Sequence, residues 1–392
     1  TYFDNEEQTN RVLIIISDGE DHFGESAIRA AEEASKEGIR IFTIGVGDIK
    51  GGPIPIKRNG VVLNYKKDRQ GETVITRLNE ENLKSIAAEA NGVYIISATP
   101  FLDDGSIDME SADRLTDFYI EKGVSGITIL GMMGEAPKLT ADESKAFMTR
   151  VLKRVNGKIP VVVGVSNAGM DNLAKLSNDA MNLGAAGVMV APFAAHKTDE
   201  AIFNYFAAVD KALGSNIPMI YQDFPLVTNA DVSVECLMRI IREIPQVVML
   251  KHEDWPGLGK LSALRNKSTA EGLRRISVLC GNGGLYLPQE LGRGADGAMT
   301  GFAFPEMLVD VCKKYAEGDI NGAEDLFDAY LPLVRHEQQP GYGLAVRKEV
   351  LRRRGAITSA KTRAPGPSLT AEDHKDLDRL FERLEKRLAS LD

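Results

Sequence analysis

The sequence is poor in the residues that mark disulfide-rich, zinc-binding or membrane-spanning proteins. Its three cysteines, Cys236, Cys280 and Cys312, form no CxxC pair, which argues against structural zinc and favours reduced thiols. No apolar run reaches the roughly 18 residues that a membrane helix needs, and no signal-peptide pattern is apparent. These absences predict a cytoplasmic protein with no membrane partner.

Positive charge is also scarce. The formal net charge is −9, and the longest basic run is Arg352–Arg354. This balance argues against a nucleic-acid partner. A hydrophobic fraction of 43% and a charged fraction of 26% are ordinary for a soluble α/β protein. The 392 residues leave room for one (β/α)₈ barrel, which takes roughly 250 residues, and an appended segment.

A regular alternation of strands and helices begins at residue 93. The predicted strands are Val93–Ala98, Gly126–Leu130, Pro160–Gly164, Gly187–Ala191, Pro218–Tyr221, Val247–Lys251, Ser277–Cys280 and Gly297–Thr300. Eight strands with helical crossovers are typical of a (β/α)₈ TIM barrel. Helical patterns near 305–317, 321–335 and 341–354, and from Ala371, predict a C-terminal helical extension. We therefore assign residues 93–392 to the barrel and these helices.

Residues 1–92 have a different pattern. Apolar runs at 11–16 and 39–46 predict buried parallel strands, and residues 25–37 have helical spacing. A hairpin is expected around Asn59-Gly60. The order β-α-β-hairpin-α-β indicates an incomplete doubly wound α/β segment, whose last strand, at 93–98, could instead be the first strand of the barrel.

Three features fall at the carboxyl ends of predicted barrel strands, where barrel enzymes place their catalytic groups. Lys251 ends an apolar strand, so burial is expected to lower the pKa of its amine and free it to attack a carbonyl. Tyr221 on the adjacent strand could transfer protons beside it. The loop Gly131–Glu135 could hold a carboxylate with backbone N–H groups. Taken singly, the lysine could be solvated and the tyrosine a core residue.

These residues carry a resemblance to a known family. Residues from about 96 to 390 resemble the dihydrodipicolinate synthase / N-acetylneuraminate lyase superfamily. The matching positions are Thr99–Phe101, Gly131–Glu135 where the family has GTTGE, Tyr221, Lys251, Gly281-Asn282, Gly294–Gly297 and Arg363–Thr370.

The resemblance implies a class I lyase, an aldolase or dehydratase that needs no cofactor or metal. Lys251 would form a Schiff base with a 2-oxo acid, such as pyruvate or a sugar-acid derivative, and Tyr221 would be the general acid/base. The backbone at Met132 and Met133 would hold the substrate carboxylate. Met299 would lie near the bound acid, and Gly281 would form a turn at the pocket floor. The family also implies a homo-oligomer, a dimer or a tetramer.

Several positions depart from the family pattern. Met132 and Met133 replace two threonines, one of them part of a proton relay. Ala194 replaces the relay tyrosine that a neighbouring subunit contributes, and Val227 replaces an arginine that binds the second substrate's carboxylate. An apolar side chain cannot replace a bidentate guanidinium. We therefore expect a lyase other than a true dihydrodipicolinate synthase. The alternative is a catalytically silent barrel that serves as a sensor or scaffold.

The first segment has a resemblance of its own. Residues from about 10 to 95 resemble the second half of a von Willebrand factor A domain, on the runs Ile16–Glu20, Ile41–Gly47 and Leu83–Ala87. In that family Asp18 would help to build a metal-ion adhesion site, whose DxSxS motif is absent here. A metal-dependent adhesion module is a further alternative for this segment. The simpler interpretation is that Asp18 caps a turn. The segment could be a truncated remnant or an artificial junction.

Overall fold

The computed structural model describes residues 92–193, 195–214 and 217–391, and the backbone of six strands before residue 92. The chain divides into two compact units, Thr1–Ala90 and Asn91–Asp392. Ala194 lies outside the described residues, as do Asp18 and the helices predicted at 25–37 and 80–90.

The strands described in the first unit form three pairs. They are β1 (Arg11–Ser17) with β2 (Ile39–Gly45), β3 (Gly52–Pro53) with β6 (Ile75–Thr76), and β4 (Pro55–Arg58) with β5 (Val61–Tyr65). The first pair is parallel and the other two are antiparallel. Strands β4 and β5 flank Asn59-Gly60, so the predicted hairpin is confirmed.

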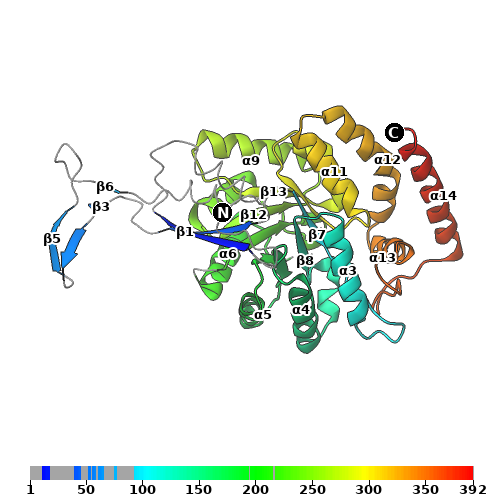
Figure 1. Ribbon diagram of the computed structural model, residues 1–392, viewed down its shortest axis with the longest axis horizontal. Helices are drawn as coiled ribbons and strands as arrows, with labels where there is room; N and C mark the ends of the chain where they lie inside the picture. Colours follow the sequence, from blue (N-terminus) through cyan, green and yellow to red (C-terminus); the bar gives the residue numbers. More distant parts are fainter. Residues whose placement is uncertain are drawn as a thin grey trace. The chain divides into compact units, whose positions relative to one another are not determined.

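The second unit is a closed barrel of eight parallel strands (Figure 1). Its strands are β7 (Gly92–Ile96), β8 (Gly126–Ile129), β9 (Val161–Gly164), β10 (Gly187–Val190), β11 (Met219–Asp223), β12 (Val247–His252), β13 (Ser277–Cys280) and β14 (Gly297–Thr300). Strand β7 pairs with both β8 and β14, so it is the first barrel strand. The predicted TIM barrel is confirmed, and all eight predicted strands overlap the observed ones.

Helices connect the strands and extend the chain beyond β14. The α-helices are α3 (Met109–Glu121), α4 (Ala141–Val155), α5 (Met170–Asn182), α6 (Asp199–Leu213), α7 (Pro225–Thr228), α8 (Val234–Glu243), α9 (Leu258–Ala270), α10 (Leu287–Leu291), α11 (Pro305–Ala316), α12 (Ile320–Glu337), α13 (Gly343–Arg353) and α14 (Ala371–Leu388). The 3₁₀ turns are η1 (Met132–Gly134), η2 (Ala136–Lys138) and η3 (Asn282–Gly284). Capping boxes at Thr140 and Thr370 begin α4 and α14.

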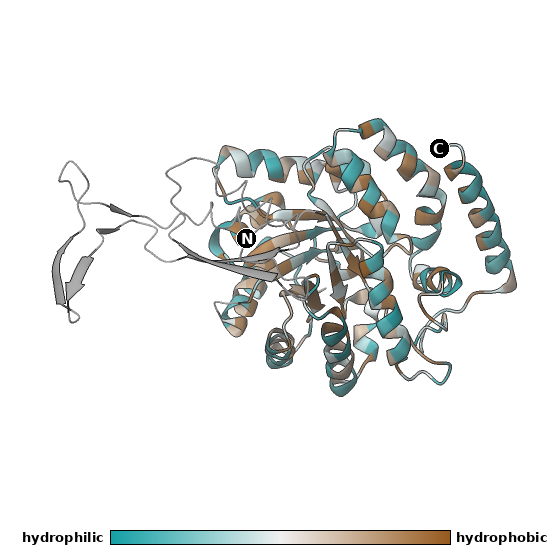
Figure 2. Ribbon diagram, viewed as in Figure 1, coloured by the Kyte–Doolittle hydropathy of each residue, from teal (hydrophilic) through white to brown (hydrophobic). Residues whose placement is uncertain are grey.

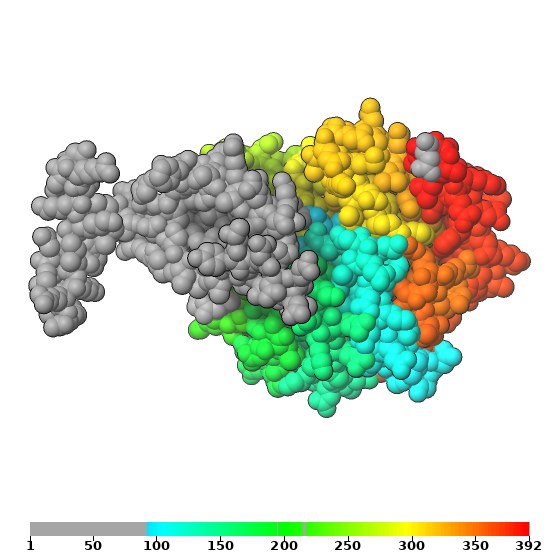
Figure 3. Space-filling model, viewed as in Figure 1, coloured from blue at the N-terminus to red at the C-terminus, as the bar shows by residue number. Residues whose placement is uncertain are grey.

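The main core lies between the strands and the helices around them. Each strand alternates its side chains between this core and the barrel interior, because successive strand residues point to opposite sides. Figure 2 shows apolar strands and helices with polar outer faces. The C-terminal helices α12–α14 lie together beside α11, in orange and red in Figure 3. Within the described residues, no helix combines the length and apolarity that crossing a bilayer requires.

Candidate active site

The register of β11 and β12 determines which side chains enter the barrel. Tyr221 pairs with Leu250, and Gln222 pairs with Lys251. The Tyr221 ring packs against Phe206 of α6 at 4.3 Å between centroids, so Tyr221 faces the helices. Because paired residues of parallel strands share a side and successive residues alternate, Gln222 and Lys251 face the barrel interior.

Tyr221 is therefore not beside the Lys251 amine, which corrects the prediction made from its place at the strand end. The phenol is buried among apolar side chains, and burial raises its pKa well above the ordinary value. The physical reason is the two-residue period of the strand, since a one-residue displacement moves a side chain to the opposite side. Tyr221 is a core residue of the kind weighed as the alternative, and Gln222 takes the position beside the lysine.

The Lys251 amine is buried in an ion pair with a carboxylate. Lys251 is only 5% exposed, and its Nζ lies 2.8 Å from Oε2 of Glu253. Gln222 Nε2 donates to the same oxygen at 2.8 Å. Asn282, just after β13, donates from its side-chain amide to the Glu253 backbone carbonyl at 2.9 Å. This hydrogen bond holds the Glu253 main chain in place. A buried amine and a carboxylate that can accept its proton are thus in contact.

Gly281 allows this arrangement. A Cβ at residue 281 would lie 2.8 Å from Cδ of Glu253 and closer still to its Cγ. Any side chain here would therefore displace the carboxylate from Lys251. The predicted turn is present as well, because η3 begins at the following residue.

The turn after β8 lies at the same end of the barrel. A Cβ at Gly131 would be 3.4 Å from Met189 and 3.6 Å from Ile96, two side chains from non-adjacent strands that meet inside the barrel. Met132 is 38% exposed, while Met133 extends to the guanidinium of Arg347 on α13. Thr99 fastens the turn by donating to the Gly134 carbonyl at 2.7 Å. The turn contains the two methionines at the positions predicted to hold a carboxylate.

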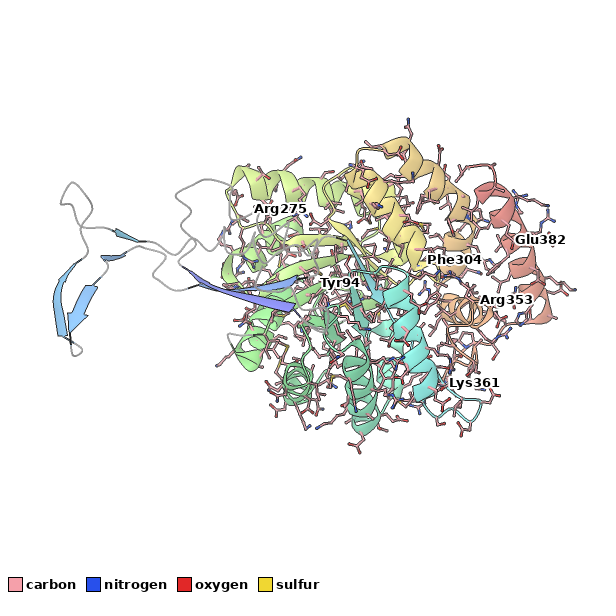
Figure 4. The ribbon with its side chains drawn as sticks, in the orientation of Figure 1. Tyr94, Arg275, Phe304, Arg353, Lys361 and Glu382 are labelled. Carbon is pink, nitrogen blue, oxygen red and sulfur yellow. The ribbon has the colours of Figure 1, made fainter. Side chains whose placement is uncertain are left out.

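Met299 lies inside the barrel. It is fully buried on β14 and pairs with Tyr94 of β7. The Tyr94 ring covers Gly126, where a Cβ would be 2.5 Å from Cδ1 of the ring. Figure 4 labels Tyr94 among the strands of the barrel. Both residues come from the strands themselves, so they form part of the filling of the barrel.

A buried ionic contact joins the β8 turn to the C-terminal helices. Lys348 of α13 is fully buried, and its Nζ lies 2.6 Å from Oε1 of Glu135. The Lys348 amine also donates to the Lys361 carbonyl, and the Arg363 backbone N–H donates to Glu135. Burial lowers the pKa of Lys348 to about 8, although Glu135 opposes that shift. The C-terminal extension thus supports the turn.

A second charged cluster lies on the helix side of β11 and β12. Lys260 of α9 contacts Asp223 at 2.8 Å and Asp254 at 3.0 Å. Burial raises the pKa of Asp223 to about 6, and Lys260 limits the shift. His252 Nδ1 lies 3.0 Å from Glu290 Oε2. Sequence reasoning missed this cluster, because Lys260 and Glu290 are distant in sequence from the strand ends that they contact.

The remaining sequence predictions concern the rim of the site and metal binding. Val227 on α7 is 53% exposed, so the position predicted to have lost an arginine is an apolar surface residue. Among the residues that the structure describes, no group of three or more histidine, cysteine or acidic side chains could hold a metal ion. The three cysteines are free thiols.

Comparison with known proteins gives a consistent family. A model described as the Dihydrodipicolinate synthetase family matches residues 89–384. L-2-keto-3-deoxyarabonate dehydratase of Azospirillum brasilense is 33% identical over 75% of this chain and 94% of that protein. The 4-hydroxy-tetrahydrodipicolinate synthase of Laribacter hongkongensis is 29% identical over 60% of this chain and 79% of that protein.

Solved structures agree with this result. A dihydrodipicolinate synthase from Rhodopseudomonas palustris is 49% identical, with a TM-score of 0.74, over 75% of this chain and 98% of that chain. A prophage protein of E. coli K12, solved with pyruvate, is 25% identical, with a TM-score of 0.69, over 76% of this chain and 99% of that chain. The family match begins at residue 89, so the von Willebrand factor A resemblance of the first segment gains no support.

Proposed function

Because the chain belongs to the Dihydrodipicolinate synthetase family, we propose that it is a class I lyase that binds a 2-oxo acid covalently to Lys251. The observation that carries this proposal is the buried contact between the Lys251 amine and the Glu253 carboxylate at 2.8 Å inside the barrel. A nucleophilic amine needs a neighbour that can accept its proton and return it to a leaving hydroxyl.

Glu253 supplies that chemistry in place of the predicted tyrosine. The carboxylate takes a proton from the Lys251 ammonium, and the free amine adds to C2 of the 2-oxo acid. The protonated Glu253 gives its proton to the resulting oxyanion and takes one back from the new ammonium nitrogen, which forms the neutral carbinolamine. It then gives that proton to the hydroxyl group, which leaves as water, and a protonated imine remains. Gln222 holds the carboxylate and Asn282 holds the Glu253 main chain, which keeps the carboxylate in reach of the reacting carbon.

The same carboxylate can complete a dehydration. Glu253 removes a proton from C3, so that the C3–H electron pair forms the enamine. The enamine expels the hydroxyl group on C4, which leaves as water with the proton of Glu253. Hydrolysis of the imine releases the product and restores the lysine, with no net oxidation. The 33% identical relative is named a dehydratase, which supports loss of water from a 2-oxo sugar acid over cleavage of a carbon–carbon bond.

The binding of the second substrate separates this proposal from synthase activity. The 49% identical structure is described as a dihydrodipicolinate synthase. Here Val227 stands at the position that would need an arginine, and it cannot pair with a second carboxylate. We therefore expect no condensation of pyruvate with aspartate semialdehyde.

We also propose that the protein is a homo-oligomer. Light scattering after size-exclusion chromatography would measure its mass.

Borohydride trapping tests the proposal. The wild-type protein is incubated with pyruvate and reduced, and intact mass and peptide mapping locate the adduct. One reduced pyruvate per chain on Lys251, absent from the Lys251→Ala variant, is the expected result. An unmodified wild-type protein would favour the silent barrel. A panel of 2-oxo-3-deoxy sugar acids then separates the reactions, because aldol cleavage releases pyruvate and dehydration retains every carbon.

A further inference from the structure

The charged cluster on the helix side of β11 and β12 contains residues that are next in the chain to residues of the candidate active site. Asp223 follows Gln222 in the chain, and Asp254 follows Glu253. Lys260 of α9 lies between the two carboxylates, with Nζ at 2.8 Å from Asp223 and 3.0 Å from Asp254. One cation therefore joins the ends of β11 and β12 to a helix.

The alternation of strand residues carries this link into the barrel. Asp223 pairs with His252 on the helix side, whereas Gln222 pairs with Lys251 on the inside. The Glu253 N–H also donates to the Asp223 carbonyl at 2.9 Å. A displacement of either strand end would therefore change the distance between Gln222 and the Glu253 carboxylate, now 2.8 Å.

The charges explain why the cation is needed. Asp223 is fully buried, and only 9% of the Lys260 side chain is exposed. Without the ammonium, two carboxylates would face the same enclosed volume. Like charges in a buried site separate or one of them takes up a proton. Either response releases the contact that ties the two strand ends to α9.

We infer that Lys260 is a positioning residue: its bridge between Asp223 and Asp254 sets the geometry of Gln222, Lys251 and Glu253 for proton transfer. This inference rests on the proposed Schiff-base chemistry, but it concerns a residue on the other side of the strands. Lys260 makes no contact with substrate in this account. It affects the rate of proton transfer to and from the bound acid and leaves the lysine nucleophile itself in place.

Exchange of the pyruvate methyl protons with D₂O, followed by NMR, isolates the step in question. Exchange requires the imine and removal of a C3 proton, but no second substrate. For Lys260→Met we expect the exchange rate at saturating pyruvate to fall about 100-fold, with less than roughly a threefold change in the pyruvate concentration at half-saturation. Lys260→Arg keeps the bridging charge and should restore most of the rate. Lys314→Met removes an exposed ion pair with Asp319 and is the matched control.

Thermal unfolding is measured for each variant, so that rates are compared only between folded proteins. If Lys260→Met does not fold, Asp254→Asn replaces it, because Asp254 is partly exposed and the contact between Lys260 and Asp223 is retained. A smaller decrease in the exchange rate is then expected. An exchange rate equal to that of the wild type, in a folded Lys260→Met or Asp254→Asn protein, would overturn the inference. Failure of the wild-type protein to form any borohydride-trapped adduct would instead overturn the proposed function.

Discussion

Replacement of Glu253 by glutamine removes a proton acceptor while it keeps the shape of the side chain. In the structure one Glu253 oxygen contacts the Lys251 amine and accepts from Gln222, both at 2.8 Å. A neutral amide cannot take the amine proton or return it to a leaving hydroxyl. General acid/base catalysis by one side chain contributes about 10²–10⁴-fold, so we expect pyruvate C3 exchange to fall by that factor.

The same change also removes the anion from the buried Lys251–Glu253 ion pair, so the free energy of unfolding should fall by about 3–5 kcal/mol. NMR exchange and urea denaturation measure the two effects on the same preparation. Glu372→Gln, at an exposed ion pair on α14, is the control and should change neither. Exchange by Glu253→Gln within roughly threefold of the wild-type rate would refute Glu253 as the general base.

Three further predictions follow from buried contacts. Gly281→Ala forces Glu253 away from Lys251, so pyruvate exchange should fall about 100-fold while the protein remains folded by circular dichroism; an active variant would show that the close packing is unimportant. Lys348→Met leaves Glu135 buried without its cation, which should cost about 3–5 kcal/mol in urea denaturation, whereas Lys375→Met, at an exposed pair, should cost less than about 1 kcal/mol. Burial raises the pKa of Asp223 to about 6, so the folded state holds this proton more tightly than the unfolded chain. The free energy of unfolding should therefore decrease as pH rises from about 4 to 6, where the unfolded chain loses this proton and the folded protein keeps it. Denaturation across that range should show the decline in the wild type and not in Asp223→Asn, and equal slopes would contradict the shift.

Much of the fold could be predicted because parallel barrel strands are buried on both sides. Runs such as Val161–Gly164 and Ser277–Cys280 are nearly continuous apolar segments between polar turns, so their positions are evident in the sequence. The direction of a side chain is harder to predict. Strand β11 continues to Asp223, two residues beyond the predicted end, and a bulge beside Met219 shifts its register against β12.

The candidate site was predicted in part. Lys251 lies inside the barrel as expected, whereas Tyr221 lies on the helix side of β11. A local signal for Glu253 existed, because it follows Lys251 by two residues and a two-residue period puts both on one side. Lys348 and Lys260 have no comparable signal, since their partners are brought near only by the closed barrel and its helices.

A crystal structure of the wild-type protein with pyruvate would show the linkage to Lys251 itself. We expect continuous density from the Lys251 amine to C2 of the bound acid, with the Glu253 carboxylate in hydrogen-bonding distance of the new linkage. The carboxylate of the bound pyruvate should contact the backbone of the Met132–Met133 turn. Pyruvate bound elsewhere, or a Lys251 amine still paired with Glu253 and unmodified at saturating pyruvate, would contradict the assignment.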